Sequence, residues 1–204
     1  MSRLILVRPG CTDFDEQQRI QGALDLPLSR KGREQVAHLM RDMASVEIDL
    51  VYASPTEPAL STAEQIAAAR GIPMKRLEDL VNINQGLWQG LQLEELKRKL
   101  PRVFKQWQES PGCICPPGGE SLSEALDRVK RVLERPLKKK GRIAIVAADP
   151  LAGLIAAIVN GTSLTEVSPM CTGGCGTWEY LRDAPESGSS AEFVAVNLAA
   201  FRTA

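Results

Sequence analysis

The sequence predicts a single α/β domain with a mostly parallel central sheet. Short, wholly apolar runs at Leu4–Val7, Ile48–Ala53 and Ile143–Ala147 are typical of buried parallel strands. Helical segments separate these runs, and strands that alternate with helices favour a parallel sheet covered by helices. The chain has 204 residues and shows no internal repeat or linker, so we expect one domain over residues 1–204.

The expected helices have clear end signals. Ser29 is a favourable N-cap for a helix over Arg30–Ala44, and Gly71 is a favourable C-terminal cap for an alanine-rich helix over Ala59–Arg70. Three more helical segments are expected: Glu94–Glu109 with a break at Pro101, Ser121 to about Lys138 with a Ser121–Glu124 capping box, and Leu151–Val159. Loops are expected up to Gly22, over residues 72–92 and over residues 185–190. Closing strands are expected at Gly176–Leu181 and Phe193–Leu198.

Composition excludes several classes of protein. The chain carries 25 Lys and Arg residues against 25 Asp and Glu residues, and this balance argues against a nucleic-acid binder, which needs a basic excess. We expect no membrane span, because a bilayer requires roughly 20 consecutive apolar residues. The apolar run after Met1 is too short for a signal peptide. Five cysteines, an odd number, indicate free thiols in a reducing cytoplasm.

Ligands of parallel α/β sheets bind outside the carboxyl ends of the strands. Three segments take that position here: Arg8-Pro9-Gly10, Ser54-Pro55 and Ala148-Asp149-Pro150. The sequence therefore predicts that any functional site lies where these segments meet.

Five motifs follow one another along residues 4–165. They are Leu6-Val7-Arg8-Pro9-Gly10-Cys11-Thr12; Arg19-Ile20-Gln21-Gly22 with Asp25-Leu26-Pro27-Leu28-Ser29; Tyr52-Ala53-Ser54-Pro55 with Thr62-Ala63-Glu64; Gly86-Leu87-Trp88-Gln89-Gly90; and Pro117-Gly118-Gly119-Glu120-Ser121. In this order they resemble the histidine phosphatase superfamily, in its phosphoglycerate-mutase-like branch. The resemblance implies a three-layer αβα sandwich. It also implies phosphoryl transfer through a phosphohistidine, with two arginines and a second histidine on the phosphate and a carboxylate as acid or base.

Most of that catalytic set is replaced in this chain. The first arginine of the family is present as Arg8. The nucleophilic histidine, the second arginine, the acid/base glutamate and the second histidine fall on Pro9, Pro58, Asn82 and Ala148. A prolyl nitrogen is an amide with no lone pair to attack phosphorus. The resemblance thus predicts a pseudoenzyme without a cofactor, which binds a small ligand or a protein partner in a regulatory role and, like many family members, forms a homodimer.

Alternatives remain open at the same cleft. An active hydrolase with a new mechanism would use Cys11 or Asp149 as nucleophile or base. Arg8, Thr12 and Gly22 are candidates for weak binding of phosphate or another oxyanion. For Arg8 we favour a structural ion pair with Asp149 or with Asp15 over a phosphate-binding role. Asp15 stands where the family commonly has an asparagine on the phosphate.

Two further candidates are weaker. The single histidine, His38, lies on the helix face opposite the apolar stripe, so we expect it in solvent rather than in a site. Cys113, Cys115, Cys171 and Cys175 would form a four-thiolate zinc site only if the fold joined their loops. Their spacing is not the usual one for zinc, and we expect no metal.

Overall fold

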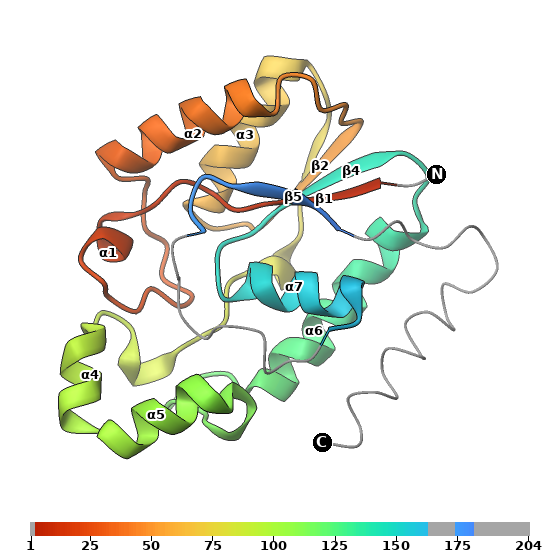
Figure 1. Cartoon of the computed structure of the whole chain (residues 1–204). Coiled ribbons are helices and arrows are strands. Elements are labelled where there is room, and N and C mark those ends of the chain that lie inside the picture. Colours follow the sequence, from red (N-terminus) through yellow and green to blue (C-terminus); the bar gives the residue numbers. More distant parts are fainter. Residues whose placement is uncertain (1–2, 163–173, 182–204) are drawn as a thin grey trace.

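The computed structural model describes residues 3–162 and 174–181. Its described part contains a five-stranded sheet in the order β3-β2-β4-β1-β5, with layers of helices on both faces (Figure 1). The strands are β1 (Arg3–Val7), β2 (Leu50–Ala53), β3 (Met74–Arg76), β4 (Arg142–Val146) and β5 (Trp178–Tyr180). Strands β1 to β4 run parallel, and β5 is antiparallel to β1. The predicted three-layer α/β architecture is confirmed.

The helices form two layers and a side cluster. They are α1 (Asp13–Glu16), α2 (Arg30–Asp42), α3 (Ala59–Arg70), α4 (Leu93–Lys99), α5 (Pro101–Glu109), α6 (Leu122–Lys138) and α7 (Leu151–Asn160). Helices α2 and α3 lie on one face of the sheet, and α6 and α7 lie on the other (Figure 1). Within the described ranges, no helix is both long enough and apolar enough to cross a membrane.

Alternate residues of each strand supply the two cores. Leu4 and Leu6 of β1 belong to the cluster under α6 and α7, whereas Ile5 and Val7 belong to the cluster under α2 and α3. All four side chains are at most 5% exposed. Because successive strand residues point to opposite faces, a strand buried on both sides must be apolar throughout. This explains the uninterrupted apolar run that identified β1 in the sequence.

A third cluster holds the loops beside the sheet. The indole rings of Trp88 and Trp107 meet edge to face with 5.2 Å between their centroids. Ile20, Leu96 and Phe104 complete this cluster, which joins the loop after α1 to α4 and α5. Burial of these side chains fixes the segment around Gln21 next to the carboxyl ends of the strands.

Most predicted elements are confirmed, and two loop predictions are wrong. Residues 72–92 contain strand β3, and the predicted loop before Gly22 contains α1. Strand β3 is short and largely exposed, with the sequence Met-Lys-Arg, so it has the polar character of an edge strand rather than the apolar character of a buried one. The predicted strand at Phe193–Leu198 and the loop over 185–190 lie outside the described residues.

His38 is in solvent, as predicted. Its side chain is 66% exposed, and its Nδ1 lies 2.8 Å from a carboxylate oxygen of Asp42 one turn further along α2. This position places it on the helix surface, away from the strand ends.

Acid should weaken the junction between β2 and β4. Asp49 accepts hydrogen bonds from the side chain and the backbone N–H of Arg142, and these bonds lower the pKa of its carboxyl to about 2. A carboxyl with a depressed pKa in the folded state stabilises that state above its unfolded pKa, and this stabilisation is lost as the pH falls through the folded value. We expect part of the stability to disappear between about pH 4 and pH 2.

Urea unfolding of the wild type and Asp49→Asn over this pH range tests the prediction. The variant should be less stable than the wild type at pH 7, and the difference should shrink toward pH 2. A difference that stays constant with pH would contradict the role assigned to Asp49.

Candidate functional site

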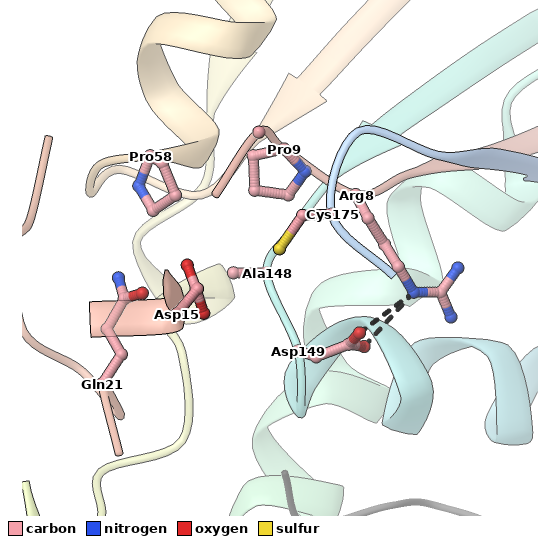
Figure 2. Close-up of a pocket in the computed structure, with 9 residues that line it drawn as sticks. Arg8, Pro9, Asp15, Gln21, Pro58, Ala148, Asp149 and Cys175 are labelled. Carbon is pink, nitrogen blue, oxygen red and sulfur yellow. Dashed lines mark hydrogen bonds and ion pairs between the residues drawn. The ribbon is translucent and has the colours of Figure 1, made fainter. Parts of the chain in front are cut away.

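A small pocket lies at the carboxyl ends of β1 and β4 (Figure 2). Parallel pairing sets Val7 beside Val146, so the residues that follow each strand meet at one edge of the sheet. The described residues that line the pocket are Arg8, Pro9, Gly10, Asp15, Gln21, Pro58, Ala148, Asp149 and Cys175. The volume that the centre of a water-sized sphere can occupy inside this pocket is about 10 Å³. This is room for about one water molecule.

Three of the positions that the resemblance predicts to be replaced catalytic positions line this pocket. Pro9 follows β1, Pro58 precedes α3, and Ala148 follows β4. In the view of Figure 2 the rings of Pro9 and Pro58 lie above Asp15 and Ala148. None of these three side chains carries a hydrogen-bond donor or a nucleophilic atom. The sequence therefore identified positions that the fold does bring together, and their side chains offer no polar group to a ligand.

Asn82, the fourth replaced position, holds the start of α7. It is 5% exposed; its Nδ2 donates to the carbonyl of Asp149 at 2.8 Å, and its Oδ1 accepts from the N–H of Leu151 at 3.2 Å and of Ile83 at 2.8 Å. Helix α7 begins after Pro150, which has no capping side chain of its own. Asn82 thus accepts from the N–H of the first residue of α7, one of the backbone donors that a helix start leaves without a partner inside the helix.

Arg8 is paired with two carboxylates. Its Nε lies 3.3 Å from both carboxylate oxygens of Asp149, and its Nη1 lies 2.6 Å from Oε1 of Glu179 on β5. The side chains of Arg8 and Asp149 are only 17% and 16% exposed. Of the two structural pairings considered for Arg8, the structure contains the one with Asp149.

The electrostatics of this pair reflect its burial. Burial alone lowers the pKa of Arg8, but the attraction of Asp149 and Glu179 outweighs it, and the net pKa is raised. Burial raises the pKa of Asp149, and the neighbouring guanidinium offsets this only in part. Asp149 also accepts from the backbone N–H of Gly153 at 3.2 Å, in the first turn of α7.

The candidate anion-binding groups do not converge on the pocket. The backbone N–H and the hydroxyl of Thr12 both donate to Oδ2 of Asp15, at 2.7 and 2.8 Å, in the capping box of α1. Gly22 adopts a positive φ of 59° and packs against the side chain of Gln89. The donors of Thr12 are thus used within α1, and Arg8 is paired with carboxylates. Binding of an oxyanion stays a prediction.

Cys11 has no direct access to the pocket in this geometry. The residue is 4% exposed, and its thiol lies 3.4 Å from the Ser29 hydroxyl and donates to Glu16 at 3.7 Å. Burial raises the pKa of this thiol, and the nearby carboxylates raise it further. A protonated thiol is a poor nucleophile, so this environment is that of a structural cysteine.

Three contributors to the site were missed from the sequence: Gln21, Cys175 and Glu179. Gln21 lies in the family-like Arg-Ile-Gln-Gly stretch, which was a usable signal. Glu179 faces Arg8 only because β5 pairs antiparallel with β1, and nothing in the sequence near residue 179 indicates this partner. Among the described residues, the site contains three carboxylates, those of Asp15, Asp149 and Glu179, and one guanidinium, that of Arg8. The formal charge of the site is therefore negative.

The structure gives no support to a zinc site. Residues 3–162 and 174–181 contain no group of three or more His, Cys, Asp or Glu side chains placed to hold a metal ion. Cys113 and Cys115 are exposed, whereas Cys175 lines the pocket. Cys171 lies outside the described residues.

Comparisons with known proteins agree with this architecture. The profile of the histidine phosphatase superfamily (branch 1) matches residues 4–178. Phosphoserine phosphatase 1 of Hydrogenobacter thermophilus is 30% identical over 183 residues, which cover 88% of this chain and 85% of that protein. A bifunctional protein of Mycobacterium tuberculosis is 34% identical over 135 residues, which cover 66% of this chain and 37% of that protein.

Solved structures share the fold. The mycobacterial glucosyl-3-phosphoglycerate phosphatase complexed with VO3 superimposes with a TM-score of 0.78 at 23% identity, over 87% of this chain and 91% of that one. At this identity the likeness concerns the fold alone.

We expect the Arg8–Asp149 ion pair to stabilise the folded protein. Arg8→Gln leaves the carboxylate of Asp149 in a site with little water, and breaking a largely buried pair of this kind costs roughly 3–5 kcal/mol. Because both side chains keep some exposure, we expect a decrease of about 2–3 kcal/mol in the free energy of unfolding, measured in urea at pH 7.

The matched control is Arg76→Gln, which breaks the exposed Arg76–Glu64 pair. This control should change the free energy of unfolding by less than about 1 kcal/mol. An Arg8 kept only for an absent phosphate would behave differently: its removal would be neutral or stabilising, and that result would contradict the structural role.

Proposed function

We propose that this chain, which belongs to branch 1 of the histidine phosphatase superfamily, is a non-catalytic member whose scaffold is kept for binding or regulation. One observation carries the proposal. At the family's phosphoryl-transfer position the fold brings together Pro9, Pro58 and Ala148, with the remaining arginine paired to Asp149.

Hydrolysis of a phosphate ester is very slow without catalytic groups, so replacement of these groups should remove almost all activity. Enzymes that hydrolyse phosphate monoesters supply accelerations of up to ~10²¹-fold. A serine protease stripped of its catalytic side chains keeps only ~10³–10⁴-fold over water, from binding and fixed charges. The pocket described above has no histidine among its lining residues, and its one arginine faces the carboxylates of Asp15 and Asp149, so its net charge would also repel an anionic substrate. By this comparison, residual turnover would be negligible.

The scaffold argues for a retained role. The Ser121–Glu124 capping box and the glycine cap of α3 are formed, and the core residues of the sheet are fully buried. Replacement is concentrated at the site, whereas unconstrained decay would also damage caps and core. We infer a protein that binds a small molecule or a protein partner through this fold.

The second candidate is an active hydrolase with a non-histidine nucleophile or base. The observation in its favour is that Asp149 lines the pocket with a pKa raised by burial, a property shared with many general acids and bases. Against it stands the pairing of both Asp149 oxygens with Arg8.

An activity screen decides between the two. The purified protein, incubated with p-nitrophenyl phosphate, phosphoserine and 3-phosphoglycerate, should release no phosphate above the buffer rate, because Pro9 stands where the resemblance places the nucleophilic histidine. It should likewise trap no ³²P-labelled phosphoprotein.

Two variants sharpen the screen. Turnover that disappears in Cys11→Ser or in Asp149→Asn would establish the alternative mechanism and reject the non-catalytic proposal. Turnover that both variants retain would point to a contaminating phosphatase, for which a Pro58→Ala preparation purified in parallel serves as control.

A further inference from the structure

The pocket is narrow because a turn of the chain closes it. Gly174–Thr177, the segment just before β5, lies over the carboxyl end of β1, and the Cys175 thiol points into the space between Pro9 and Ala148 (Figure 2). The pocket has room for about one water molecule, which is less than a tetrahedral anion occupies.

Backbone hydrogen bonds fasten the turn to the loop that follows β1. The N–H of Gly176 donates to the carbonyl of Pro9 at 2.7 Å, and the N–H of Arg8 donates to the carbonyl of Thr177 at 2.8 Å. Within the turn, the Thr177 hydroxyl donates to the carbonyl of Gly174 at 2.5 Å. The turn is thus bonded to the two residues that, by family position, would be the phosphate ligand and the nucleophile.

Close packing explains why the turn has glycine at positions 174 and 176. A Cβ on Gly174 would lie 2.7 Å from Cδ of Arg8, which is closer than real Cβ atoms come to other heavy atoms, and 3.0 Å from Oδ2 of Asp149, which is a tight contact. Gly176 has a φ of +69°, and a Cβ there would lie 2.7 Å from Cβ of Gln35. The backbone of the turn therefore packs directly on the Arg8–Asp149 pair.

A side-chain ion pair holds the far end of the turn. Glu179, on β5, receives the Nη1 donor of Arg8 at 2.6 Å, and its own side chain is 41% exposed.

We propose that Gly174–Thr177 is an autoinhibitory plug, latched by the Arg8–Glu179 ion pair, and that its withdrawal is required before any ligand reaches Arg8 and Asp149. This proposal rests on the proposed function and adds a regulatory contact at the same site. A partner that competes for Glu179, or that pulls on β5, would open the pocket.

Alkylation of the cysteines by iodoacetamide, followed by mass spectrometry, tests the plug in the intact protein. Cys113 is exposed and serves as an internal reference. Burial raises the pKa of the Cys175 thiol to about 12, and the carboxylates of Asp15 and Asp149 add to the shift. With few thiolates and a closed pocket, Cys175 should react at least about 100-fold more slowly than Cys113.

Glu179→Gln tests the latch. Loss of one charge-assisted bond, at roughly 1.5 kcal/mol, should accelerate Cys175 labelling on the order of tenfold and leave Cys113 unchanged. Glu64→Gln, which breaks an exposed ion pair elsewhere, is the matched control and should change neither rate. The amides of Gly176 and Arg8 should exchange hydrogen faster in Glu179→Gln, in parallel with the labelling.

Each other outcome overturns the plug or its latch. Labelling of wild-type Cys175 at the rate of Cys113 would show an open pocket. An unchanged Cys175 rate in Glu179→Gln would remove the latch. Faster labelling without faster exchange at the two amides would mean that only the thiol chemistry had changed. Phosphatase turnover by the wild type would instead reject the non-catalytic function, independently of these rates.

Discussion

The site depends on the parallel pairing of β1 with β4. This register places Val7 beside Val146 and so brings the loops that carry Arg8 and Asp149 to one edge of the sheet. The two residues are 141 positions apart in the chain, yet their side chains form a largely buried ion pair. A guanidinium removed from water requires a counter-charge, and here the protein supplies one itself, where the family fold would accept it from a phosphate.

This internal counter-charge also ties several segments of the fold together. With Asp149 and Glu179 on Arg8, three segments of the chain meet at one cation: the end of β1, the start of α7 and strand β5. Asn82 adds a fourth connection, since it holds the backbone at Asp149 and Leu151. Residues that the resemblance places at catalytic positions of the family thus form contacts that order the edge of the sheet.

Sequence patterns predicted most of the secondary structure, and the exceptions have physical causes. Helices with good caps, such as α3 before Gly71 and α6 with its Ser121–Glu124 box, were located closely because the signals lie within a few residues of each helix end. Strand β3 was missed, since its Met-Lys-Arg sequence has no apolar pattern and it forms through pairing with β2. Helix α1 was missed because one capping box in a polar loop gives little periodicity.

The sequence by itself determined the fold class, the family resemblance and the identity of the replaced groups at Pro9, Pro58, Asn82 and Ala148, because each is a matter of residue type at a motif position. Only the tertiary structure decided which contacts the remaining polar residues of the site make. Whether Arg8 meets an anion or a carboxylate, and whether Cys11 or Cys175 faces the pocket, depends on contacts between segments far apart in the chain. Side-chain type fixes which interactions are available, whereas strand pairing and burial decide which partner is within reach.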